Sequence, residues 1–102
     1  VAFFMDDNIL AGLIANAKNP NDFEIVGPIL STEPYGIMLN KGDAAMKKIA
    51  DTAVLNMIKS GEMEKSYKKW FQSPIPPKNV NMNWKMNESM KKALAEPSDV
   101  GI

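Results

Sequence analysis

The sequence contains no histidine, cysteine or arginine among its 102 residues. Without histidine and cysteine it has no Ser-His-Asp triad, no nucleophilic thiolate and no imidazole or thiolate ligand for a metal. Without arginine it has no guanidinium group that could clamp a carboxylate through two hydrogen bonds. These absences exclude most enzymatic chemistry, and we expect no catalytic residue, no metal and no cofactor.

Net charge and long apolar runs are also missing. Twelve lysines balance twelve acidic residues, so the chain lacks the basic stripe that binds phosphates, and we expect no nucleic-acid partner. No stretch reaches the roughly 18 consecutive apolar residues that a membrane-spanning helix needs. The length allows one modest core. The composition therefore indicates one small domain that does not act on nucleic acid.

Three short apolar segments, residues 1–5, 23–27 and 35–39, have the pattern of β-strands. The first is stopped by two aspartates and is typical of a buried strand in a parallel sheet. Apolar residues at helical spacing separate the first two segments, so residues 1–27 are predicted to form a βαβ unit. No methionine opens the sequence, and we expect the sheet partners of these strands in a longer protein.

The longest helical pattern lies in the middle of the chain. Apolar residues recur on one face from Met46 to Ile58, behind Asp43 as a plausible N-cap. Gly61 follows the last periodic residue and predicts the end of this helix. A turn is predicted just before it, at residues 40–42.

Two further helices are predicted after Gly61. One begins at Glu62 and places aromatic residues at helical spacing, which most often form part of a core: Tyr67, Trp70 and Phe71. The other is short, runs from about Glu88 to Leu94 and is capped by Asn87. The proline-rich residues 73–77 between them cannot be a helix or a central strand.

Asp6 and Asp7 stand where the first predicted strand ends and a helix begins, an edge of an open sheet that often holds ligands. A carboxylate there can accept hydrogen bonds from an ammonium group. The alternative is that one aspartate merely caps the helix, a role for which Asp7 or Asn8 is available. Both interpretations can hold, because there are two carboxylates. A divalent metal site is disfavoured, since no third ligand lies nearby in sequence.

Several short motifs follow one another along the whole chain: Ala2-Phe3-Phe4-Met5-Asp6-Asp7, Glu24-Ile25-Val26-Gly27, Glu33-Pro34-Tyr35-Gly36-Ile37, Lys41-Gly42-Asp43, Ser60-Gly61-Glu62, Lys69-Trp70-Phe71 and Pro74-Ile75-Pro76-Pro77. In this order and spacing they resemble the C-terminal part of the polar amino-acid solute-binding proteins of ABC importers, in the type II periplasmic-binding-protein family. Each motif alone is weak, but their combination is specific.

The resemblance implies an α/β fold, the C-terminal portion of a two-lobe protein with a parallel-type sheet and flanking helices. By this resemblance residues 1–27 are the last βαβ unit of the second lobe, and residues 28–34 are the hinge that returns to the first lobe. Residues 35–73 are then the C-terminal part of the first lobe. Residues 74–102 form a proline-rich tail with one short helix.

The resemblance also implies a function. Such a protein is periplasmic and non-catalytic, binds an acidic amino acid (glutamate or aspartate) and delivers it to an inner-membrane ABC permease. Asp6 falls on the family's aspartate that holds the α-ammonium group, Met5 borders the same cleft, and Tyr35 approaches the ligand after the hinge. The family's arginine for the α-carboxylate belongs to the first lobe, upstream of Val1.

Two other functions share this fold: an enzyme, such as a dehydratase or lyase acting on small acids, and a ligand-sensing receptor domain. The enzyme would need an acid or base in the cleft, for which this chain offers only Asp6 and Asp7. The receptor would need transmembrane flanks. For the 102-residue chain by itself we expect self-association, because its apolar strand and helix faces would lack their natural cover.

Overall fold

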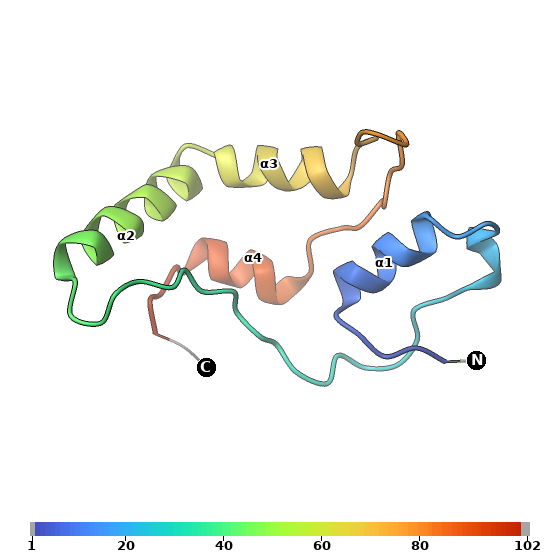
Figure 1. The fold of residues 1–102 in the computed structure, drawn as a ribbon, viewed down its shortest axis with the longest axis horizontal. Helices are drawn as coiled ribbons and strands as arrows, with labels where there is room; N and C mark the ends of the chain where they lie inside the picture. The colour runs from blue at the N-terminus through green and yellow to red at the C-terminus, as the bar shows by residue number, and fades with distance from the viewer. Residues whose placement is uncertain (1, 101–102) are drawn as a thin grey trace. The chain divides into compact units, whose positions relative to one another are not determined.

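The computed structural model describes residues 2–100, and helices dominate this range (Figure 1). The α-helices are α1 (Asp7–Ala15), α2 (Ala44–Lys59), α3 (Glu62–Phe71) and α4 (Glu88–Ala95), and a short 3-10 helix, η1 (Pro20–Asp22), follows α1. Extended chain and turns join them. All four predicted helices are therefore confirmed.

Local sequence signals account for both ends of α2. The Asp43 carboxylate accepts a hydrogen bond from the backbone N–H of Met46 at 2.9 Å, as an N-cap does. Gly42, in the turn just before this cap, has φ +83°, and Gly61 has φ +76° just beyond the helix. Such positive φ values strain most other residues. The predicted cap, turn and helix stop are confirmed.

The two later helices also begin where expected. Asn87 caps α4, because its side-chain oxygen accepts a hydrogen bond from the backbone N–H of Met90 at 2.8 Å. Helix α3 carries acidic residues in its first turn and lysines in its last, which suits the helix dipole. The predicted core face of α3 is not formed in the described residues: Trp70 is 45% exposed, and Tyr67 and Phe71 are only half-buried.

The three predicted strands are not formed in the described residues. Residues 2–5, 23–27 and 35–39 carry no strand assignment, and Val1 lies outside the described range. The backbone pairing found among residues 2–100 is one isolated antiparallel bridge, Ile75 to Val80. A strand requires hydrogen bonds to a neighbouring strand, and within residues 2–100 none of these segments forms a ladder with another. The sheet of the expected α/β fold is therefore not confirmed by the described residues.

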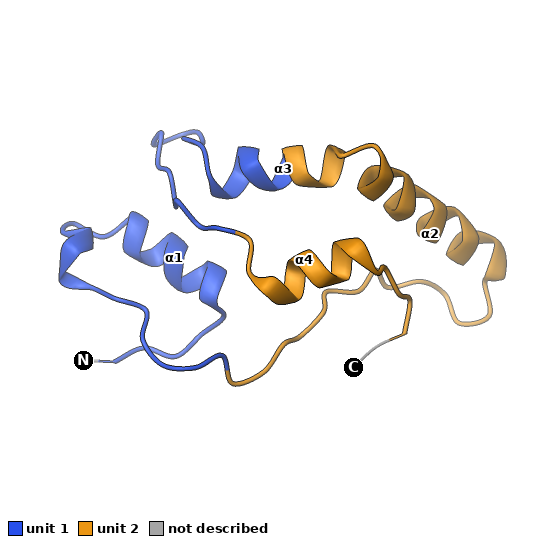
Figure 2. Cartoon of the chain, turned by 180° about the vertical axis from the view of Figure 1, so that it is seen from behind, with its two compact units in different colours: residues 1–29, 66–85 blue, residues 30–65, 86–102 orange. Residues whose placement is uncertain are grey.

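The chain divides into two units, coloured separately in Figure 2. Unit 1 contains the chain up to Ile29 together with Ser66–Lys85, and unit 2 contains Leu30–Lys65 and the chain from Met86 onward. The boundary therefore falls between residues 29 and 30, within α3 between residues 65 and 66, and between residues 85 and 86. Among the described residues the only buried hydrophobic one is Ala11, in unit 1.

Unit 1 holds a short hairpin against the C-terminal end of α3. Trp84 N–H donates to the Phe71 carbonyl at 2.9 Å, and the Asn81 side-chain amide donates to the Gln72 carbonyl at 3.2 Å. The Gln72 side chain in turn donates to the Trp84 carbonyl at 3.3 Å. The first two bonds satisfy carbonyls that an α-helix leaves without partners at its end. They tie residues 81–84 to α3.

In unit 2, one lysine on α2 pairs with two aspartates. Lys47 pairs with Asp51 one turn later at 2.6 Å and also with Asp99 near the C-terminus. All three side chains are exposed, so the network adds little stability.

No helix within residues 2–100 has the length and apolarity needed to cross a membrane.

Candidate functional site

The start of α1 contains the aspartate that the resemblance assigns to the ligand. Asp6 occupies the N-cap position, and its backbone carbonyl accepts from Leu10 N–H at 2.9 Å. Its carboxylate makes no capping hydrogen bond to the helix. The expectation that Asp7 or Asn8 is the N-cap residue is therefore wrong by one or two positions. The residue at the cap position does not use its side chain as a cap.

The side chains of the two residues after Asp6 accept hydrogen bonds from the first backbone amides of the helix. The Asp7 carboxylate accepts from the Asn8 N–H at 2.7 Å, and the Asn8 side-chain oxygen accepts from the Ile9 N–H at 3.0 Å. Helix N-termini leave such N–H groups without intrahelical partners. Because these neighbours supply acceptors, the helix does not require the Asp6 carboxylate.

Asp7 also influences an aromatic residue of α3. Partial burial raises the pKa of Tyr67, and the negative charge of Asp7 raises it further. The Tyr67 ring stacks on Phe71 with ring centroids 4.6 Å apart. The phenol therefore stays protonated at neutral pH, and its ring belongs to the packing of unit 1.

The three predicted ligand-binding residues lie in different parts of the chain. Met5 is 48% exposed and directly precedes Asp6 in unit 1. Tyr35 is 85% exposed and belongs to unit 2. Met5 and Asp6 are thus neighbours in one unit, and no single unit holds all three residues.

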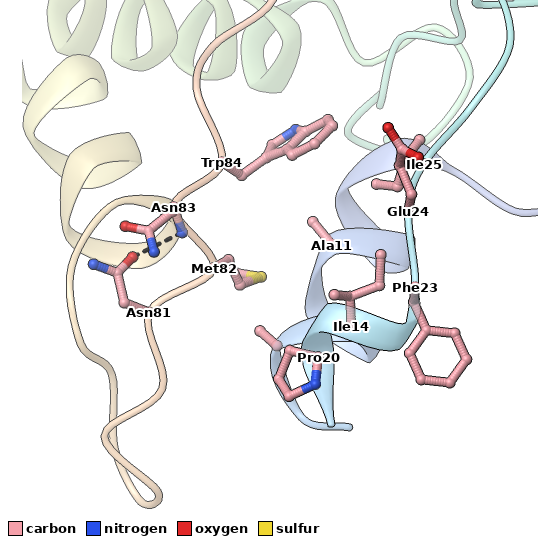
Figure 3. Close-up of a pocket in the computed structure, with 11 residues that line it drawn as sticks. Ala11, Ile14, Pro20, Phe23, Glu24, Ile25, Asn81, Met82, Asn83 and Trp84 are labelled. Atoms are coloured by element: carbon pink, nitrogen blue, oxygen red, sulfur yellow. Dashed lines mark hydrogen bonds between the residues drawn. The ribbon is translucent and has the colours of Figure 1, made fainter. Parts of the chain in front are cut away.

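Unit 1 also contains an open hollow of about 420 Å³ beside α1 (Figure 3). Its walls come from α1, from η1 and the segment after it, and from the segment tied to α3: Ala11, Ile14, Ala15, Pro20, Phe23, Glu24, Ile25, Asn81, Met82, Asn83 and Trp84. None of the predicted ligand-binding residues lines it. The sequence offered little sign of it, because its walls lie about sixty residues apart in the chain and are brought together only by folding.

Close packing between α1 and the 81–84 segment explains part of this wall. A side-chain carbon added at Gly12 would lie 3.4 Å from the Met82 sulfur. Asn83 adopts φ 51°, and its N–H donates to the Asn81 side chain at 2.8 Å. Asparagine tolerates this backbone conformation better than most residues. Within residues 2–100 no cluster of three or more acidic side chains could hold a metal ion.

Comparison with known proteins gives a consistent result. No protein-family model matches the chain. Over 97% of its length the chain is 50% identical to an L-glutamate/L-aspartate-binding protein of Pseudomonas aeruginosa. Over its whole length it is 50% identical to a glutamate/aspartate import solute-binding protein of Escherichia coli. The chain is a relative of the C-terminal part of these solute-binding proteins. The resemblance read from the motifs is confirmed.

The chain spans about a third of the length of these relatives, covering 33% of the first and 34% of the second. A more distant relative is an ABC transporter glutamine-binding protein of Bacillus subtilis, which is 32% identical over 70% of this chain and is itself covered to 25%. All three are named as binding proteins and none as an enzyme. This agrees with the expectation of a non-catalytic chain.

Proposed function

We propose that this chain is the C-terminal part of a periplasmic solute-binding protein that binds glutamate or aspartate and delivers it to an ABC permease in the inner membrane. The observation that carries this proposal is the 50% identity over the whole chain to a glutamate/aspartate import solute-binding protein.

In the proposed whole protein, Asp6 accepts hydrogen bonds from the α-ammonium group of the ligand. The geometry at α1 supports this role, because the Asp6 carboxylate does not cap the helix and the side chains of Asp7 and Asn8 serve its first amides. Met5 borders the same cleft, and Tyr35 approaches the ligand from the other lobe. The ligand carboxylates are held by the part of the protein upstream of Val1.

The proposed architecture is a two-lobe α/β fold in which residues 2–5, 23–27 and 35–39 become strands of parallel-type sheets. Their apolar side chains support this: Phe4 is 80% exposed and Val26 78% exposed, as expected of surfaces that lack their sheet neighbours. Residues 28–34 are the proposed hinge. In support, they lack helix and strand, and the boundary between the units falls within them.

Calorimetric titration of the full-length protein with glutamate, aspartate and glutamine tests the proposed ligand. We expect saturable binding of the two acidic amino acids and at least tenfold weaker binding of glutamine, whose side chain lacks the second carboxylate. Equal affinity for glutamine and glutamate, or no binding of either acidic amino acid, would contradict the assignment.

The 102-residue chain without the rest of the protein is expected to self-associate. Large apolar side chains that the proposed fold covers are exposed in both units, among them Phe4 in unit 1 and Ile37 in unit 2. Exposed apolar surface of this kind favours association, including the exchange of elements between two copies. Sedimentation at micromolar concentration tests this, and a well-ordered monomer would contradict it.

A further inference from the structure

Positive charge is concentrated in one stretch of this neutral chain. Residues 65–87 contain five lysines and no aspartate or glutamate. Four of the five belong to unit 1 and are exposed: Lys68, Lys69, Lys78 and Lys85. The stretch therefore offers a positive surface that complements an acidic partner.

A hairpin presents part of this charge. The antiparallel bridge between Ile75 and Val80 closes the hairpin, with a hydrogen bond of 3.0 Å from Ile75 N–H to the Val80 carbonyl. The side chains of Asn81 and Gln72 and the backbone of Trp84 tie its base to the end of α3. Its tip, residues 76–79, is exposed and contains two prolines and Lys78. An element held in one conformation before binding loses little conformational entropy on binding.

An exposed aromatic ring lies on the helix that carries this hairpin. Trp70 is 45% exposed, and the Lys69 ammonium lies 5.0 Å from the centroid of its ring. At this distance the cation and the ring make a cation–π contact. Exposed tryptophan is uncommon on an ordinary surface but frequent among the residues that dominate protein interfaces. Trp70 is thus a candidate anchor beside one positive charge, that of Lys69.

We propose that Lys69, Trp70 and the hairpin tip around Lys78 form a docking surface for an acidic face of a protein. This inference rests on the proposed function, which makes that protein the ABC permease of the importer. A protein is favoured over an anionic membrane because the first 29 residues of the same unit carry four acidic residues and one lysine. A charged lipid surface would repel those acids, whereas a permease contacts only the docking surface.

The test uses the full-length binding protein and its permease in neutral lipid vesicles. Lys69→Glu with Lys78→Glu reverses two charges of the docking surface, and Lys41→Glu with Lys59→Glu makes the same change at exposed lysines of unit 2. We expect the first pair to raise the concentration for half-maximal stimulation of the permease ATPase at least tenfold. The control pair should change it less than twofold, and glutamate affinity should stay within twofold in both.

Substitutions of Trp70 test its role as an anchor. Trp70→Ala should also raise the half-maximal concentration, and Trp70→Phe should restore part of the loss, because an aromatic ring returns. Added salt should weaken stimulation by the wild type more than by the reversed pair, because screening removes the attraction only where it exists. Circular dichroism checks folding. If the double variant does not fold, Lys78→Glu alone at the exposed tip is measured, with an expected rise of at least threefold.

Several results would overturn the proposal. One is a half-maximal concentration for the docking-surface pair that equals that of the control pair. Another is a half-maximal concentration for Lys78→Glu alone that equals that of the control pair. Tight binding of the wild type to anionic lipid vesicles without permease, lost in the docking-surface pair, would assign the surface to the membrane instead. These results are distinct from a failure of the proposed function, which would appear as a wild-type protein that does not bind glutamate.

Discussion

Two helices of this protein begin on an aspartate and use it differently. At α2 the Asp43 carboxylate accepts a hydrogen bond from the Met46 N–H at 2.9 Å. At α1 the Asp6 carboxylate makes no capping bond, although Asp6 holds the same position relative to its helix. Residue type and position are the same in both cases. The role of a capping aspartate therefore depends on what its neighbours supply.

The neighbouring residues explain this difference. Helix α2 opens with Ala44, Ala45 and Met46, none of which has a side-chain acceptor for the first amides, so Asp43 must provide one. Helix α1 opens with Asp7 and Asn8, whose side chains accept from the next N–H groups. Asp43 is thus a capping residue of its helix, whereas the Asp6 carboxylate makes no capping hydrogen bond.

The largest effect is expected on ligand binding. Replacing Asp6 with alanine in the full-length protein should weaken glutamate binding by about 3 to 5 kcal/mol, because the buried ammonium group loses its charged partner. Calorimetry measures the affinity, and Asp43→Ala is the control that should leave it unchanged. An Asp6→Ala affinity within threefold of wild type, less than about 1 kcal/mol, would remove Asp6 from the site.

A second prediction separates the two halves of the proposed site. The full-length protein at a glutamate concentration about 1,000 times its dissociation constant should gain about 4 kcal/mol by mass action. The 102-residue chain should show no thermal shift with millimolar glutamate or aspartate. It offers Asp6 for the ammonium and no arginine for either carboxylate, and a solvent-exposed charge pair contributes about 0 to 1 kcal/mol. A saturable shift with the short chain would mean that it holds a complete site.

For ligand affinity the larger effect is expected at Asp6, but for the free energy of unfolding it is expected at Asp43. Asp43→Ala removes a capping hydrogen bond and should lower the free energy of unfolding by about 1 kcal/mol. Asp6→Ala should lower it by less than half as much, because no capping bond is lost. Urea denaturation of the full-length variants, without ligand, measures both. Equal losses would show that the two aspartates are equivalent caps.

The smallest effect concerns the ion network of unit 2. Hydrogen bonding and charge from Lys47 lower the pKa of Asp99 below its ordinary value. The ion pair between Lys47 and Asp99 therefore contributes stability at neutral pH. This contribution is lost as the pH falls through the lowered pKa of Asp99. An NMR titration of the Asp99 carboxyl group should show this, and Lys47→Met should return the pKa toward its ordinary value. An Asp99 pKa that does not change in Lys47→Met would contradict the network.

Local features of the fold could be predicted from the sequence. The four helices, the caps at Asp43 and Asn87, and the stop at Gly61 were all predicted and are present. Helical hydrogen bonds join residues four apart, and caps join residues three apart. Every partner of such a bond therefore lies within a few letters of sequence. The relationship to solute-binding proteins was also readable, because it depends on the order of motifs along the chain.

The remaining features depend on partners that are distant in sequence. The expected strands are unpaired here because a ladder needs another strand, however suitable the segment itself is. Helical spacing placed Trp70 in a core, but spacing does not specify which surface covers a helix face, and the ring is exposed. The pairing of Asn81 with Gln72 and of Lys47 with Asp99 is likewise decided by folding. The sequence by itself determined which segments are helical and which family they resemble, since those depend on near neighbours and motif order. The tertiary structure alone decided which side chains meet.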